Sequence, residues 1–248
     1  MMACTHGHAV NGFVSRTLLA YDGSHDLEHA RRVSRNAAHI FVGPREDLSV
    51  VLVASLAHDT CDAKYNGRQR LGALELACRR DRMSEVDVTC VRRVVERISF
   101  SRLQKVGPPV DLSQRELRVW HCVSDADMLE AMGATGIVRT LMYQGHCGGD
   151  LDVALLYAEK CLLQCIHYIE QKCAHAEGTQ RQETMRMWIA ECKTVTPLRM
   201  LSEEIMLRGR RGSSFASGER LLHRGESDTV INIMARQVAR EARWTVMD

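Results

Sequence analysis

The chain has 248 residues, of which 45% are hydrophobic and 26% charged, and its formal net charge is +2. This length and composition are typical of a globular protein with a sizeable core, arranged as one large domain or as a domain with an appendage. The near balance of charge gives no argument from bulk charge for a nucleic-acid groove. Only four prolines and few aromatic residues favour helix.

The ten cysteines form no C-x-x-C pair, and most of them lie within apolar, helix-like patterns. We therefore interpret five of them as small buried residues of a reducing compartment, namely Cys78, Cys90, Cys161, Cys165 and Cys192. A zinc-thiolate site stays open as an alternative, but its usual spacing is absent. The first 14 residues lack a basic region followed by an apolar one. The longest apolar run, Val50 to Ala57, is far short of the ~20 residues that span a bilayer. We expect a cytoplasmic protein without a membrane partner.

In chain order, residues 1–14 are predicted to be a loose lead-in. The turn signal at Asp22-Gly23-Ser24 predicts the start of a helix that runs to about Phe41. His25 and His29 are four residues apart and would share one side of that helix. Gly43-Pro44 then breaks the chain.

The second predicted helix is capped by Asp47 and ends at His58-Asp59. A loop over residues 60–70 leads to helices over 71–80 and 84–98. Ser113 and Glu116 form the capping box of a helix that extends towards Asp127.

The later part of the chain is also predicted to be helical, over residues 151–173 and 179–195 in particular. Pro197 marks a boundary, residues 210–218 are a linker, and a last amphipathic helix begins at Arg220. No strand-like alternation of useful length occurs. The prediction is an all-α fold, a helical bundle over residues 1–195 with a helical C-terminal extension over residues 196–248.

Histidines and carboxylates stand at three points of this pattern. His58 and Asp59 adjoin where an apolar run gives way to polar residues. The stretch from Ser24 to His29 lies upstream, and Ser124-Asp125-Ala126-Asp127 lies downstream. One imidazole from the first stretch, the His-Asp pair and one carboxylate from the third would give four ligands. Such a set suits a borderline or hard divalent cation.

These motifs resemble the HD superfamily of metal-dependent phosphohydrolases, especially its small stand-alone branch of predicted nucleotide hydrolases. The signature is a histidine, then His-Asp, then a distal Asp, and it is matched here by His29, His58-Asp59 and Asp127. The resemblance continues through His58-Asp59-x-x-Asp62-x-Lys64-Tyr65 and Ile98-Ser99-Phe100-Ser101. It spans roughly residues 20–145 and implies that the bundle is an HD domain.

The resemblance also implies a role for each site residue. One divalent metal ion (Mn, Fe, Mg, Co, Ni or Zn) would be held by His29, His58, Asp59 and Asp127. The other roles are phosphate contact for Lys64 and Arg32, general base or acid for Asp62, orientation of the ligands for Asp26 and Asp125, and stacking on a base for Phe100.

Each of these roles has an alternative. His25 and His29 could both be ligands, as in a zinc-binding helix, although only His29 matches the motif. Lys64 and Arg32 could be surface charges, Asp62 could cap a turn, and Phe100 could seal a core edge.

The expected activity is hydrolysis of a small phosphorylated substrate, above all a nucleotide, because the branch includes nucleoside-triphosphate pyrophosphohydrolases. Two alternatives stay open. One is a phosphomonoesterase or phosphodiesterase of the same fold, and the other is a non-catalytic module that binds metal and nucleotide. The sequence indicates no nucleic-acid partner and leaves the oligomeric state open. Because every motif precedes residue 146, we expect residues 196–248 to be dispensable for the chemistry.

Overall fold

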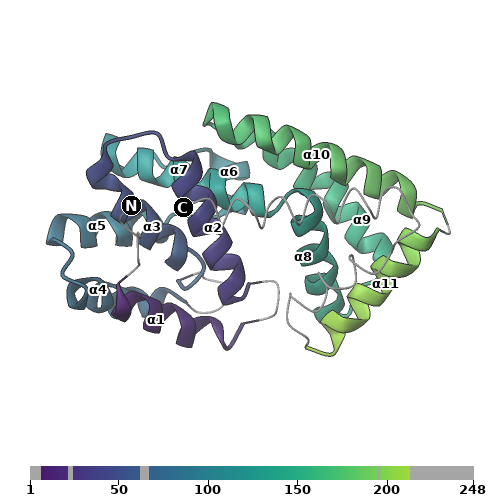
Figure 1. Ribbon diagram of the computed structural model, residues 1–248, viewed down its shortest axis with the longest axis horizontal. Helices are drawn as coiled ribbons and strands as arrows, with labels where there is room; N and C mark the ends of the chain where they lie inside the picture. Colours follow the sequence, from purple (N-terminus) through teal and green to yellow (C-terminus); the bar gives the residue numbers. More distant parts are fainter. Residues whose placement is uncertain (1–6, 22–24, 62–66, 195, 213–248) are drawn as a thin grey trace. The chain divides into compact units, whose positions relative to one another are not determined.

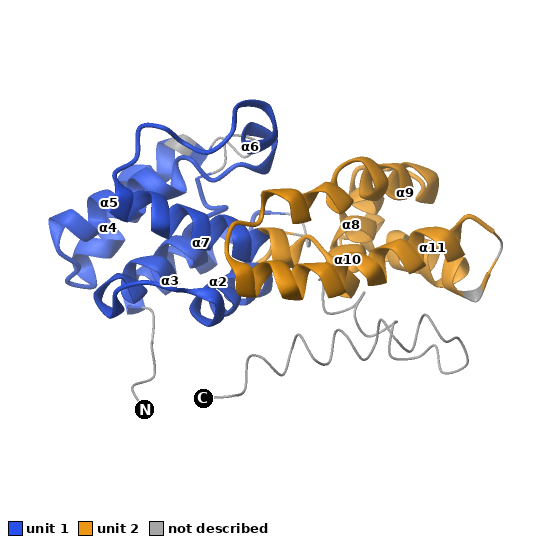
Figure 2. Ribbon diagram, turned by 90° about the horizontal axis from the view of Figure 1, so that it is seen from above, with its two compact units in different colours: residues 1–21, 27–127, 248 blue, residues 22–26, 128–247 orange. Residues whose placement is uncertain are grey.

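The computed structural model describes residues 7–21, 25–61, 67–194 and 196–212, and these residues form helices and no strand (Figure 1). The all-α prediction is confirmed. Within the described ranges, no helix combines the length and the apolar character needed to cross a membrane. The chain divides into two compact units, one with residues 27–127 and the residues up to Tyr21, the other with Asp26 and the residues from Met128 onward (Figure 2).

The first unit contains most of the helices before residue 128. They are α1 (His8–Leu18), α2 (Leu27–Ile40), the 3-10 helix η1 (Arg45–Asp47), α3 (Leu48–Ala57), η3 (Gly67–Arg70), α4 (Leu71–Arg80), α5 (Glu85–Val95), α6 (Phe100–Val106) and most of α7 (Gln114–Glu130). The second unit contains the end of α7 and the later helices. They are α8 (Gly133–His146), α9 (Leu151–Lys160), η4 (Leu162–Tyr168), α10 (Lys172–Cys192) and α11 (Pro197–Arg210).

Helix α3 is the core of the first unit. Every residue from Val50 to Ala57 is buried, as expected for a helix that is apolar on all sides. It packs against α1, α2 and α5. The hydroxyls of Ser34 on α2 and Ser55 on α3 both donate to the carbonyl oxygen of Leu52, at 3.2 and 3.0 Å. These bonds satisfy two buried hydroxyls and tie α2 to α3.

Helix α7 is attached to the same core through charged and polar contacts. Its predicted capping box is present, because Ser113 N donates to Glu116 Oε2 at 2.7 Å and Glu116 N donates to Ser113 Oγ at 3.3 Å. Arg115 binds the buried carboxylate of Asp47 and that of Asp87, both at 2.6 Å. Asp47 precedes α3 as predicted, but its side chain binds Arg115 and makes no capping bond to the helix.

The predicted loose lead-in is wrong for the described residues from Gly7 onward. Helix α1 begins at His8 and buries Val10, Phe13 and Val14. Its first N–H groups are satisfied from elsewhere in the chain, because the Asp81 carboxylate accepts from Ala9 N at 2.9 Å and from Val10 N at 2.8 Å. A cap supplied from the end of α4 leaves no local signal in the sequence.

The single helix predicted over residues 151–173 is also wrong. Helix α9 ends at Lys160, and η4 follows as a tighter 3-10 turn that buries Leu162, Cys165 and Ile166. The Leu163 carbonyl oxygen accepts from the side chain of Gln182 on α10, at 2.7 Å. A hydrogen bond from another helix therefore satisfies a carbonyl group of the 3-10 segment.

In the second unit α11 packs against α8, α9 and α10. Residues Leu198, Ile205 and Met206 of α11 are buried, and a Cβ at Gly145 of α8 would overlap the carbonyl oxygen of Met206. The boundary between the compact units falls between Asp127 and Met128. It does not coincide with the predicted division at residues 195 and 196.

Candidate metal centre

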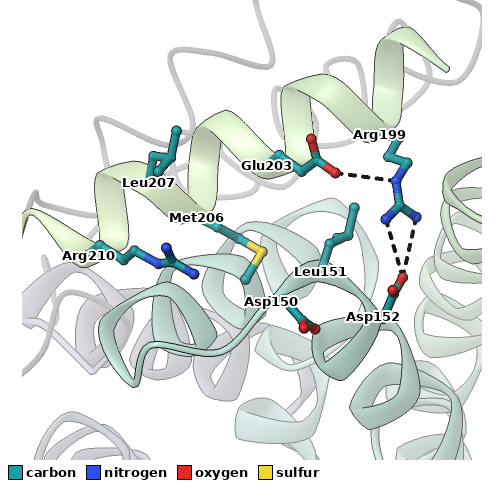
Figure 3. A pocket seen from close by; sticks show the side chains of 8 residues that line it. All are labelled: Asp150, Leu151, Asp152, Arg199, Glu203, Met206, Leu207 and Arg210. Carbon is teal, nitrogen blue, oxygen red and sulfur yellow. Dashed lines mark hydrogen bonds and ion pairs between the residues drawn. The ribbon is translucent and has the colours of Figure 1, made fainter. Parts of the chain in front are cut away.

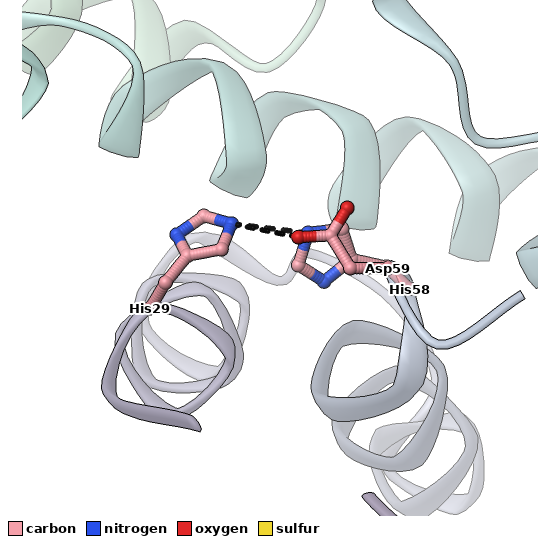
Figure 4. Close-up of side chains that lie close together, drawn as sticks. All are labelled: His29, His58 and Asp59. Carbon is pink, nitrogen blue, oxygen red and sulfur yellow. Dashed lines mark hydrogen bonds and ion pairs between the residues drawn. The ribbon is translucent and has the colours of Figure 1, made fainter. Parts of the chain in front are cut away.

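Three helices of the first unit bring two histidines and two aspartates together. His29 comes from α2, and His58 and Asp59 follow α3 directly (Figure 4). The Nε2 atoms of the two imidazoles lie 3.2 Å apart. Asp59 Oδ2 is 3.4 Å from His29 Nε2 and 3.3 Å from His58 Nε2. These three residues form a group that could hold a metal ion.

Asp127 of α7 lies beside the same group. Its Oδ1 atom is 3.4 Å from His29 Nε2 and 3.6 Å from His58 Nε2. Nitrogen and oxygen atoms that each bind one metal at about 2.0–2.2 Å are separated by roughly 2.8–3.6 Å in octahedral or tetrahedral geometry. The observed distances between the side-chain atoms therefore fit a shared cation.

The orientation of His58 is fixed by the backbone. Its Nδ1 lies 2.7 Å from the carbonyl oxygen of Ser55, and a carbonyl only accepts. In the neutral imidazole the proton is therefore on Nδ1, and the lone pair of Nε2 points at His29 and the carboxylates. A backbone carbonyl is one of the usual partners that set the tautomer of a metal-binding histidine.

The charges of the cluster act strongly on each other. Burial by itself lowers the pKa of His58, but the carboxylates of Asp59 and Asp127 outweigh it and hold that pKa well above its usual value. For Asp127 burial works in the raising direction, yet His58 and His29 bring its pKa well below the usual value. The Asp127 carboxylate is thus charged at neutral pH and attracts either a proton on the imidazoles or a metal ion.

The turn after α3 is closed by Thr60, a residue that the sequence motifs did not single out. Its N–H and its Oγ1 hydroxyl both donate to the Ala57 carbonyl oxygen, at 3.0 and 2.6 Å, and the side chain is buried. These two bonds hold His58 and Asp59 in a tight turn. A hydroxyl residue directly after the His-Asp pair is the signal that could have indicated this contact.

The remaining predicted residues are placed as follows. Arg32 is half-buried on α2, three residues after His29 and therefore on a neighbouring side of the helix. Asp125 is fully buried on α7, but it is two residues from Asp127 and points about 200° away around the helix axis.

The other predicted residues lie outside the helices of the cluster. Asp26 is half-buried directly before α2 and is assigned to the second unit, and Phe100 is half-buried at the start of α6. Asp62 and Lys64 lie outside the described residues.

The zinc-helix alternative does not hold. Helix α2 begins at Leu27, so His25 precedes it and the helical relation to His29 is absent. The ring of His25 instead meets Tyr143 edge-on, with centroids 5.8 Å apart, within the second unit.

The second unit has a cavity of about 290 Å³ between the start of α9 and α11 (Figure 3). Its charged lining is already paired, because Arg199 contacts both Asp152 and Glu203 at 3.3 Å. Arg210 donates to the Gly149 carbonyl oxygen at 2.8 Å. Nothing there resembles the cluster of the first unit.

Fold and site together define an all-α protein with a histidine and aspartate group that could hold a metal ion. No family model matches the chain. Over 198 residues the chain is 26% identical to Bacillus subtilis YpgQ, a protein described as uncharacterized, and the match covers 76% of this chain and 92% of that relative.

The solved structures agree with the fold. YpgQ of Bacillus subtilis in complex with ADP has a TM-score of 0.60 to this chain at 25% identity, over 76% of this chain and 97% of that one. A Lactobacillus plantarum protein from structural genomics gives a TM-score of 0.61 at 23% identity, over 75% of this chain and 93% of that one. The second likeness concerns the fold alone.

Proposed function

We propose that the protein is a metal-dependent phosphohydrolase of the HD superfamily that acts on a small phosphorylated molecule, with nucleotides as the preferred class. The observation that carries the proposal is the convergence of two imidazoles and two carboxylates. The Nε2 atoms of His29 and His58 lie 3.2 Å apart, and each lies 3.3–3.6 Å from a carboxylate oxygen of Asp59 and of Asp127. The four residues follow one another along the chain in the order of the superfamily signature.

The donor set fits one divalent cation. Such an ion, when bound, lowers the pKa of a coordinated water and polarises a phosphoryl oxygen. The chain contributes the orientation of its ligands, since Ser55 fixes the His58 imidazole and Thr60 closes the turn that presents Asp59. Arg32 of α2 can neutralise phosphate charge near His29. We assign phosphate contact to Lys64 and the transfer of a proton to or from water to Asp62, on the motif alone.

The preference for nucleotides is supported by the ADP complex of YpgQ, which aligns with three quarters of this chain. ADP carries the diphosphate group that a divalent ion and nearby guanidinium groups recognise. The same complex is equally consistent with a protein that binds a nucleotide without hydrolysing it. The hydrolase and this binding module would both bind the nucleotide, but only the hydrolase would turn it over.

The test is a panel of nucleoside mono-, di- and triphosphates and simple phosphoesters, each incubated with Mn²⁺, Mg²⁺, Co²⁺ or Ni²⁺. Pyrophosphate and phosphate are measured separately. Release of pyrophosphate from triphosphates, absent in the His58→Ala variant, is the expected result. Release of phosphate from nucleoside monophosphates or simple monoesters would identify a phosphomonoesterase, and cleavage of a diester would identify a phosphodiesterase. Binding of metal and nucleotide without turnover would identify the binding module.

A further inference from the structure

A tyrosine that no motif includes lies against the turn that carries Asp59. Tyr21 follows the C-terminal end of α1, and its hydroxyl oxygen is 3.3 Å from the Thr60 carbonyl oxygen and 3.5 Å from that of Asp59. Burial raises the pKa of the Tyr21 phenol above its usual value, although Arg70 acts in the lowering direction. The hydroxyl is therefore protonated at neutral pH and donates to this backbone.

The same hydroxyl accepts a hydrogen bond from Arg70, the last residue of η3. Arg70 Nη1 lies 2.6 Å from the Tyr21 oxygen, and the centre of the guanidinium is 5.6 Å from the centroid of the Tyr21 ring. A guanidinium that is both hydrogen-bonded and placed over an aromatic ring is restricted in orientation. Tyr21 thus links a fixed positive charge to the backbone of the metal-binding turn.

Arg70 differs from four other partly buried arginines of the first unit. Arg92, Arg93, Arg97 and Arg115 each pair with at least one carboxylate. Among the described residues, no carboxylate lies within ion-pair distance of Arg70, which leaves most of its N–H donors directed at no acid. A preorganised guanidinium that none of the described carboxylates pairs matches the geometry and charge of a phosphate group, which accepts two parallel N–H bonds.

We propose that Arg70 contacts a phosphate oxygen of the ligand that binds at the candidate metal centre, and that Tyr21 is the positioning residue that holds the guanidinium there. This rests on the proposed function for the class of ligand, but not on turnover. The alternative is a purely structural link between η3 and the end of α1.

The experiment measures ADP and pyrophosphate binding to the full chain loaded with Mn²⁺, by titration calorimetry, together with metal content and melting temperature. Arg70→Gln should weaken both ligands by about 10- to 100-fold, the loss expected for a charge-assisted contact, and leave the metal content unchanged. Tyr21→Phe keeps the ring and should weaken binding several-fold. Arg80→Gln, an exposed residue of α4, makes the same change of charge elsewhere and should leave binding unaltered.

Wild-type affinity in Arg70→Gln, or an equal loss in Arg80→Gln, would overturn the proposal. A loss of affinity that only follows a loss of metal would overturn it as well, and so would a wild-type protein that binds neither ligand. If Arg70→Gln does not fold, Arg70→Lys decides, because it keeps the charge without the planar fork and should still bind several-fold more weakly. An Arg70-dependent affinity in a protein that hydrolyses nothing supports this inference and contradicts only the proposed hydrolase.

Discussion

The His58 Nδ1 atom lies 2.7 Å from the carbonyl oxygen of Ser55, one turn earlier in the chain. Because this bond places the proton on Nδ1, the opposite nitrogen is the one that faces His29 at 3.2 Å. Two basic nitrogens in such proximity, with two carboxylates beside them, are stable only if a cation or a proton lies between them. The choice between a proton and a metal ion determines how the protein responds to substitution and to pH.

The first prediction concerns metal retention. Replacing His29, His58 or Asp59 by Ala should abolish stable metal binding, because each side chain would supply a direct bond. His25→Ala is the matched control, since His25 contacts Tyr143 in the second unit. Elemental analysis of the purified variants gives the result. Equal loss of metal from the His25 and His29 variants would contradict the assignment.

The second prediction concerns pH. Without metal, the raised pKa of His58 adds stability that is complete below its usual value of 6.5 and is lost as the pH rises through the folded-state pKa. The lowered pKa of Asp127 adds stability above its usual value of 3.8, which is lost as the pH falls through the folded-state pKa. Chelator-treated protein should therefore melt at its highest temperature in mildly acidic buffer and at progressively lower temperatures above pH 7.

Metal should reverse this trend, because the ion needs deprotonated imidazoles. The increase in melting temperature on adding Mn²⁺ should grow between pH 6 and pH 8. The measurement is thermal unfolding at several pH values with chelator and with metal. A metal-induced increase that is larger at pH 6 than at pH 8 would contradict the account.

Local sequence patterns predicted the parts of the fold that depend on local interactions. The helical class, the capping box at Ser113 and the break at Gly43-Pro44 follow from propensity and side-chain caps. The His58-Asp59 pair stands at the end of a buried helix because an apolar run ends there. The grouping of these residues with His29 and Asp127 followed from the ordered motifs of the family resemblance.

The missed features depend on residues far apart in the chain. Helix α1 needs the carboxylate of Asp81 to satisfy its first N–H groups, and the 3-10 turn after Lys160 is bonded to Gln182. The contacts of Tyr21 with Thr60 and Arg70 likewise join three separate segments. No periodicity or spacing within one segment carries such information.

The third prediction concerns the stability of the first unit. Arg115→Ala leaves the Asp47 carboxylate, only 2% exposed, without its 2.6 Å partner. Removing one member of a largely buried pair should lower the free energy of unfolding by about 2–3 kcal/mol, somewhat less than for a fully buried pair. Arg118→Ala is the control, because Arg118 is 44% exposed and lies 3.5 Å from the Asp47 carboxylate. This substitution should lower the free energy of unfolding by under about 1 kcal/mol. Urea unfolding of both variants compares the two losses.

The fourth prediction adds a loss of stability to the expectation that residues 196–248 are dispensable for the chemistry. A chain that ends at residue 195 loses α11, whose Leu198, Ile205 and Met206 are buried in the second unit. Uncovering their partners should lower the stability of that unit by several kcal/mol, at about 1.5–3 kcal/mol for each large apolar side chain. The metal cluster lies wholly in the first unit, so the metal content should persist. Thermal unfolding and elemental analysis of the truncated chain test both parts, and metal loss with unchanged stability would contradict them.

The last prediction tests the contact of α8 with α11 by single glycine substitutions. A Cβ at Gly209 would overlap the carbonyl oxygen of Met142, which belongs to the backbone and cannot rotate away. Gly209→Ala should therefore destabilise the protein by about 1–3 kcal/mol, as overpacking does. Gly72 of α4 has open space around its Cβ position, and Gly72→Ala should stabilise the protein by about 0.5–1 kcal/mol through helix propensity. Opposite shifts of the melting temperature are expected, and a stabilising effect of Gly209→Ala would show that the two helices do not pack this closely.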